Sequence, residues 1–186
     1  NIKWLIESDE LACCIETIKF IEETGSQNVV NQNICRVIQP RMINIYYLRV
    51  KTFVVEQNRV YQEVDAYDPN AIHVFNEVDG HVNAYARVFL KDNTVTFGRV
   101  VTAADKRGSG LGRTLLEKIM TAIRVYFPNR AITIESQYQV RGFYQKFGFE
   151  VIGEPFIFES TKHIRMRHAP ITTIAHENDG HEFYQL

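Results

Sequence analysis

Runs of β-branched and aromatic residues alternate with short polar turns through the middle of the chain. Three such runs occupy residues 72–78, 81–90 and 94–101. Asp79-Gly80 separates the first two, and Asp-Gly between β-like runs is a strong hairpin signal. Because short connections join antiparallel neighbours, the pattern predicts an antiparallel meander.

Apolar residues recur at helical spacing in two longer segments. One runs from Met42 to Phe53, and the other follows the meander, with apolar residues at 111, 115, 116, 119, 120, 123 and 127. A β-branched run at 131–135 then predicts a buried strand. A strand, a helix and a second strand in succession form a parallel right-handed crossover. The sequence therefore predicts a mixed α/β fold with a mostly antiparallel sheet and one parallel crossover near its centre.

The two ends of the chain carry weaker signals. Residues 2–6 predict a short strand, and Ser8 can cap a helix that ends at Gly25. Near the other end, a short helix over 138–147 precedes strands at 149–152 and 163–167, joined by a loop through Gly153-Glu154-Pro155. We expect an N-terminal segment over 1–40, one domain over 41–169 and a loosely docked tail over 170–186.

Composition narrows the class of protein. The chain has 186 residues, of which 45% are apolar and 23% charged, as in an ordinary globular protein. Its net charge of −1 argues against a nucleic-acid binder. With no long apolar run and no signal-peptide pattern, we expect no membrane partner and a cytoplasmic location. Cys13, Cys14 and Cys35 have neither disulfide nor zinc-site spacing.

Three glycines at alternate positions, Gly108, Gly110 and Gly112, connect a strand to the second long helix. The first turn of a helix presents unpaired N–H groups at the positive end of its dipole, and glycines let an anion approach them. Arg107 and Arg113 add formal charge on either side. The stretch therefore favours a phosphate-binding loop. A plain surface turn is the alternative, because glycine-rich loops alone are weakly specific.

A dinucleotide-binding site is the second alternative for this stretch. That motif requires G-x-G-x-x-G directly after a strand and an acid near the end of the next strand. The chain has G-x-G-x-G instead, and a meander precedes it. Glu135 at the end of the next strand is the one point in favour of this alternative.

Two linked motifs carry a resemblance to a known family. Arg107-x-x-Gly110-x-Gly112, followed by Phe143-Tyr144-x-x-Phe147-Gly148-Phe149, resembles the GNAT superfamily of acyl-CoA-dependent N-acetyltransferases. Further stretches look like its ElaA-like branch: Phe53-Val54-Val55-Glu56-Gln57-Asn58, Tyr61, Asp65, His73, Ala86-Arg87, Gly98-Arg99-Val100 and His163-Ile164-Arg165-Met166. The resemblance covers about residues 42–168 and implies a GNAT-like fold with helices on both faces of the sheet.

The resemblance implies acetyl-CoA as the acyl donor. Its pyrophosphate would lie on the glycine loop, formed by Arg107, Gly108, Ser109, Gly110, Leu111, Gly112 and Arg113. The backbone of Val100, Val101 and Thr102 would hold the pantetheine amides. Gln137 stands close to the place where many relatives have an asparagine.

Acetyl transfer to an amine requires a neutral amine, a stabilised oxyanion and a protonated leaving thiolate. Tyr144 matches the family tyrosine near the thioester sulfur, which makes it the predicted general acid; a core aromatic is the alternative. The predicted general base is Glu56, in the polar stretch 54–69 that would cover the acceptor pocket. Asp65, Glu63 and Glu135 are the other candidates for this role.

The acceptor pocket is predicted to include Asp65, His73 and Arg99. Arg99 would bind a substrate carboxylate or pair with one of the acids, and His73 would line the pocket or only hydrogen-bond the loop. His163 and His168 are five residues apart on a strand, so they lie on opposite faces and cannot share a metal. We predict no metal site.

The sequence therefore predicts an acyl-CoA-dependent N-acyltransferase that works by direct transfer in a ternary complex, since no cysteine is placed to carry the acyl group. The acceptor would be a small-molecule, peptide or protein amine, and the protein a monomer or homodimer. The alternative is a CoA-binding interaction or sensory module without transferase activity.

Overall fold

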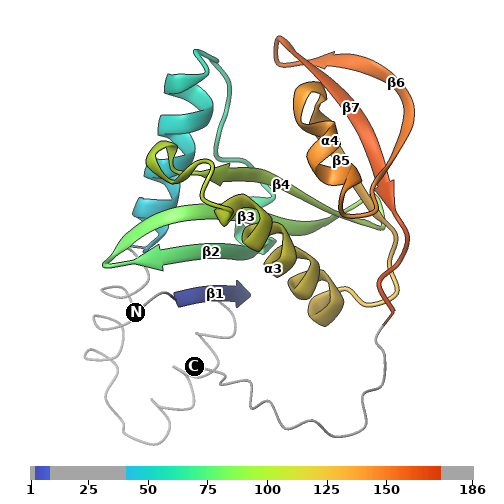
Figure 1. The fold of residues 1–186 in the computed structure, drawn as a ribbon, viewed down its shortest axis with the longest axis horizontal. Helices are drawn as coiled ribbons and strands as arrows, with labels where there is room; N and C mark the ends of the chain where they lie inside the picture. Colours follow the sequence, from blue (N-terminus) through green and yellow to red (C-terminus); the bar gives the residue numbers. More distant parts are fainter. Residues whose placement is uncertain (1–2, 9–40, 173–186) are drawn as a thin grey trace, which may run out of the picture.

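The structure is a computed structural model that describes residues 3–8 and 41–172 (Figure 1). Seven strands form one mixed sheet in the order β1-β2-β3-β4-β5-β7-β6. They are β1 (Lys3–Ser8), β2 (Ile72–Val78), β3 (His81–Lys91), β4 (Thr94–Thr102), β5 (Ile132–Gln137), β6 (Glu150–Phe158) and β7 (Thr161–His168). Among these seven described strands, only β4 and β5 pair in parallel. The predicted meander and central crossover are confirmed.

The helices also lie where apolar spacing predicted them. Residues 41–49 are α-helical and continue into a π-helical segment, η1 (Val50–Glu56). The crossover helix is α3 (Leu111–Tyr126), and α4 (Arg141–Gln145) is short. Single 3-10 turns complete the set: η2 (Asp68–Asn70), η3 (Ala104–Lys106) and η4 (Tyr138–Val140). No helix in the described ranges is long and apolar enough to cross a membrane.

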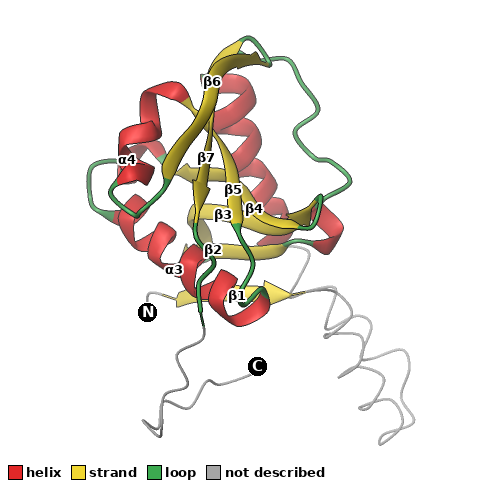
Figure 2. Ribbon diagram, turned by 90° about the vertical axis from the view of Figure 1, so that its right-hand side faces the viewer, coloured by secondary structure: helices red, strands yellow, loops and turns green. Residues whose placement is uncertain are grey.

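Helices cover both faces of the sheet (Figure 2). On one face, α3 buries Leu115, Leu116 and Ile119 against strand residues, and Tyr144 of α4 joins the same core. On the other face, Ile45 and Leu48 of the helix over 41–56 pack against the inner strands. The alternation of the strands explains this division: Val74 of β2 belongs to the first core, and its neighbour Phe75 belongs to the second.

The centre of the sheet opens between β4 and β5. Their parallel register is confined to Val95 and Ile132, near the start of each strand. The register between β3 and β4 also shifts around Arg99, whose φ of +54° is unusual for a residue with a side chain. The bulge lets Phe97 and Val100, three residues apart, both contact the α3 core. Beyond it, β4 diverges from β5.

Some predicted boundaries are wrong. Gly153-Glu154-Pro155 is part of β6, not a loop; the true turn is at Glu159-Ser160. A register shift between Ile152 and Phe156 accommodates the segment, and a proline is tolerated because β6 is the last strand of the sheet. The helix predicted over 138–147 is reduced to η4, α4 and a turn.

Residues 3–8 belong to the same sheet as the predicted domain. The strand predicted at 2–6 is confirmed as β1, which pairs antiparallel with β2 along its whole length. The helix predicted after Ser8, the rest of the N-terminal segment up to residue 40 and the end of the tail lie outside the described residues.

Candidate functional site

A cavity of about 1070 Å³ occupies the opening between β4 and β5. Its walls come from both strands, from the end of the helix over 41–56, from the loop after it and from the β6–β7 hairpin. Nε of Arg59 donates to the carbonyl oxygen of Glu159 at 3.2 Å, which joins this loop to the hairpin. The cavity exceeds the usual size of a small-molecule pocket and suits an extended ligand.

Tyr144 reaches the cavity from α4. Its side chain is 8% exposed, and its ring packs against Phe143 and Phe97, with centroids 5.3 and 6.0 Å away. None of the described residues makes a hydrogen bond to its hydroxyl. Burial raises the pKa of Tyr144 to about 12, so the phenol keeps its proton at neutral pH. The structure therefore has a protonated phenol at the opening of the sheet.

The glycine loop forms the start of α3. Gly108 and Gly110 have φ values of +78° and +87°, and a Cβ at either position would meet no atom within 4 Å. No backbone carbonyl in the described ranges accepts a hydrogen bond from the N–H groups of residues 108–112. Arg107 lines the cavity, as do Val100, Val101 and Thr102, whereas residues 108–113 lie beyond its edge. The exposed loop thus continues outward from the cavity.

A buried arginine fixes the loop over 61–68 to the first described helix. The Arg49 side chain is fully buried and donates to Oε1 of Glu63 and Oδ1 of Asp68, both at 2.7 Å. Burial alone would raise the pKa of Asp68, but the hydrogen bonds and charge of Arg49 outweigh it and lower this pKa to about 2. The carboxylate is therefore a structural anion.

Two further arginines fix the same loop to the sheet. Arg87 of β3 contacts Asp65 at 2.6 Å and Asp68 at 2.7 Å. Arg99 of β4 contacts Glu63 at 3.0 Å and Asp65 at 3.2 Å. Of the two alternatives for Arg99, the structure thus shows the ion pair. Asp65 and Arg99 both line the cavity, as parts of its wall.

Sequence reasoning missed Arg49, although a signal was available. In the helical pattern, position 49 falls on the same face as Ile45, Leu48 and Thr52, all of which are buried. A charge on a buried face requires partners, and the acidic stretch that follows supplies them.

His73 is a correction to the predicted acceptor pocket. It does not line the cavity, because both of its ring nitrogens hold the loop and the sheet. Nδ1 accepts from the Tyr85 hydroxyl at 2.8 Å, and Nε2 donates to the Asp68 carbonyl oxygen at 3.1 Å. Burial is the main cause that lowers the pKa of His73 and keeps the ring neutral. The structure supports the other alternative, a histidine that hydrogen-bonds the loop.

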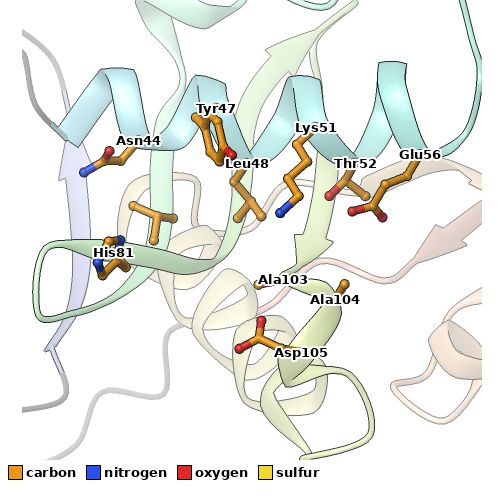
Figure 3. A pocket seen from close by; sticks show the side chains of 11 residues that line it. Asn44, Tyr47, Leu48, Lys51, Thr52, Glu56, His81, Ala103, Ala104 and Asp105 are labelled. Atoms are coloured by element: carbon orange, nitrogen blue, oxygen red, sulfur yellow. The ribbon is translucent and has the colours of Figure 1, made fainter.

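Glu56 and Arg107 form an ion pair of 2.8 Å at the cavity wall. Glu56 also lines a second cavity of about 300 Å³, between the helix and residues 103–105 (Figure 3). Lys51, Thr52 and Glu56 point into it from the helix. The i→i+5 pattern of the π-helix brings residues five apart, such as Lys51 and Glu56, onto one side.

The main cavity is also lined by the two predicted residues of β5, Glu135 and Gln137. Nη2 of Arg165 contacts Oε1 of Glu135 at 3.1 Å, and Nε2 of Gln137 donates to Oε1 of Gln57 at 3.3 Å. The acids considered as general bases, Glu56, Glu63, Asp65 and Glu135, are therefore all held by arginines.

A sheet that opens at its parallel pair, an exposed glycine loop at the start of the crossover helix and a phenol inside the opening are the features of acyl-CoA-dependent N-acyltransferases. The sequence profile of the acetyltransferase (GNAT) domain matches residues 31–169. The chain belongs to this family.

Comparison with individual proteins gives the same result and confirms the ElaA-like branch. A UPF0039 protein of Schizosaccharomyces pombe is 33% identical over 129 residues, 68% of this chain and 86% of that protein. ElaA of Escherichia coli is 32% identical over 124 residues, 64% and 81% of the two chains. The crystal structure of an acyl-CoA N-acyltransferase from Pseudomonas aeruginosa has a TM-score of 0.71 and 25% identity, covering 91% of this chain and 100% of that one. That of E. coli ElaA has a TM-score of 0.69 and 24% identity, with coverages of 89% and 99%.

Proposed function

We propose that the protein transfers the acetyl group of acetyl-CoA to an amine by direct attack in a ternary complex. The observation that carries the proposal is Tyr144, a protonated phenol without a hydrogen-bond partner in the described chain, inside the opening between β4 and β5. The leaving thiolate of CoA needs a proton, and a donor held at this point supplies it.

The glycine loop suits the pyrophosphate of the donor. The N–H groups of residues 108–112 are free of backbone partners, and they lie at the positive end of the α3 dipole. Arg107 and Arg113 bring positive charge to the two ends of the loop. The pantetheine arm would lie in the main cavity between the loop and Tyr144. It would be held there by the cavity-lining residues Val100, Val101, Thr102 and Gln137.

The acceptor would enter on the side of the loop over 57–68. Asp65, Arg99 and Glu56 contribute charged walls there. Because Glu56 lies at the end of its helix beside Arg107, its carboxylate would attract the acceptor ammonium close to the donor. Glu56 is the base that the sequence predicted, and its ion pair with Arg107 leaves room for a second candidate. The acceptor class is a small-molecule, peptide or protein amine.

A screen of amines with purified protein and acetyl-CoA tests this function. The protein is expected to release free thiol from acetyl-CoA in an amine-dependent way with at least one pool. Binding of acetyl-CoA without thiol release in any pool would contradict the proposal and identify a CoA-binding module instead.

A further inference from the structure

We propose that His163 of β7 accepts the proton from the acceptor amine, an inference that rests on the proposed function and sharpens it. His163 lines the main cavity, although its side chain is only 7% exposed. Three independent observations support this role: the face of the sheet on which His163 lies, the tautomer of its ring, and the ion pairs that engage the nearby carboxylates.

The register of the sheet places His163 on the face opposite α3. The Cα atom of His163 pairs with that of Gln137. The next pair along the two strands is Ser136 with Ile164, and Ile164 belongs to the core under α3. Residues directly opposite on paired strands share a face, and neighbours alternate. Tyr144 belongs to the core on the α3 face. A proton acceptor and a proton donor therefore approach the same cavity from opposite faces of the sheet.

The tautomer of His163 follows from its one hydrogen bond. Nδ1 lies 2.8 Å from the Thr161 carbonyl oxygen, and a carbonyl only accepts, so Nδ1 carries the hydrogen. Nε2 of the neutral ring then holds a lone pair, and no described residue donates to it. The rings of Phe156 and Phe158, with centroids 6.1 and 5.6 Å away, fix the orientation of the imidazole.

The charged groups near His163 leave this lone pair as the available base. Glu135 is paired with Arg165 on the same face, and Glu56 with Arg107. On the hairpin, the Lys162 ammonium lies 4.5 Å over the Tyr138 ring, and Arg59 reaches the Glu159 carbonyl from the facing loop. Each of these charged groups therefore already has a partner other than His163, whereas Nε2 of His163 has none among the described residues.

In the proposed step, His163 accepts one proton of the acceptor amine and Tyr144 supplies the proton for the leaving thiolate. The acceptor ammonium gives one proton to Nε2 of His163, directly or through a water, and the imidazolium later passes it to solvent. The neutral amine forms the N–C bond to the thioester carbonyl carbon. The C–S bond breaks, the thiolate takes the Tyr144 proton, and the second amine proton returns to the tyrosinate.

The test is the dependence of kcat/KM on pH for the full chain and two glutamine variants, His163→Gln and Glu56→Gln. We expect His163→Gln to lower kcat/KM about 10²- to 10⁴-fold at neutral pH, the range for loss of a general base. We also expect the deficit to shrink at high pH, where the acceptor amine is already neutral. The Glu56→Gln variant should keep the fall in kcat/KM at acid pH that the imidazole causes.

His168→Gln is the matched control, because it lies on the same strand but packs against Phe149 on the other face. His168→Gln should keep the wild-type pH profile. If His163→Gln fails to fold, His163→Asn takes its place. The inference is overturned in favour of Glu56 if the His163 variants keep the wild-type dependence of kcat/KM on pH. It is also overturned if only Glu56→Gln loses the fall in kcat/KM at acid pH. Either result leaves the proposed function standing. The proposed function itself fails if the wild type releases no thiol with any amine.

Discussion

At the scale of single residues, the proposed roles of one phenol and one imidazole depend on where the sheet opens, because Tyr144 and His163 both line the cavity there. The ring of Tyr144 packs in the core under α3, and the residue also lines the main cavity. Because burial raises its pKa to about 12, it stays protonated in the pH range where a thiol would ionise. The structure thus shows the core aromatic, and the acid role stays a prediction for the hydroxyl that reaches the cavity.

Replacement of Tyr144 by phenylalanine tests its role as general acid. We expect Tyr144→Phe to lower kcat about 10²- to 10⁴-fold, the usual contribution of a general acid, because the thiolate then leaves unprotonated. The Kd for acetyl-CoA by titration calorimetry should not change, since only the hydroxyl is removed. Tyr126→Phe, on the exposed end of α3, should change neither value. Unchanged kcat in Tyr144→Phe would reject the acid role.

The fully buried Arg49 gives a second residue-scale prediction. Arg49→Met leaves Glu63 and Asp68 buried without their partner, so we expect the free energy of unfolding to fall by about 3–5 kcal/mol. Urea denaturation measures this change. Arg124→Met, on the exposed side of α3, is the control and should shift stability by less than about 0.5 kcal/mol. Equal effects of the two variants would show that the buried ion pairs contribute nothing.

At the scale of elements, the loop before α3 and the β2–β3 hairpin offer a matched pair of glycines. Gly110 and Gly80 both have positive φ and open space at the Cβ position. An alanine at either site costs about 1–2 kcal/mol of backbone strain.

Only Gly110→Ala is expected to weaken acetyl-CoA binding, by about tenfold, because its strain alters the N–H groups that would face the pyrophosphate. Gly80→Ala should lose similar stability by thermal denaturation and bind acetyl-CoA as the wild type does. If the two variants bind equally well, the glycine loop is not the phosphate site.

Elements were predictable to the extent that their signal is local. The meander, α3 and β5 follow from periodicity, and Asp79-Gly80 fixes the first hairpin. The extension of β6 across Pro155 was not predictable, because only the place of β6 at the sheet edge makes that proline tolerable. The glycine loop and Tyr144 could be found from their motifs, but the partners of Arg99 and the true role of His73 depend on contacts between distant segments.

At the scale of the whole molecule, the three arginines and three acids around residues 61–68 tie the first described helix, the loop and the sheet together. This network contributes Asp65, Arg87 and Arg99 to the wall of the cavity and also links stability to pH. Asp68 and His73 both have pKa values below their ordinary ones.

Acidification is therefore expected to destabilise the fold in two stages. Below pH 6.5, the ordinary value for histidine, an unfolded chain protonates position 73 while the folded His73 stays neutral, so stability falls as pH decreases. From pH 3.8 down to about 2, the unfolded chain protonates position 68 before the folded Asp68 does. At about 1.4 kcal/mol per pH unit, the expected loss is about 2.5 kcal/mol.

Urea denaturation at a series of pH values measures both stages. His73→Gln should flatten the upper stage and leave the lower one. Stability that stays constant between pH 7 and 3 in the wild type would contradict this assignment of the network.

The central claim is direct transfer of the acetyl group from CoA to an amine within one complex. The most direct measurement follows thiol release and acetylated amine in the same reaction, with intact-mass analysis of the protein after exposure to acetyl-CoA alone. We predict one acetylated amine per thiol released, and no acetylated protein when the amine is omitted. Thiol release without an amine, together with an acetylated protein, would contradict the account.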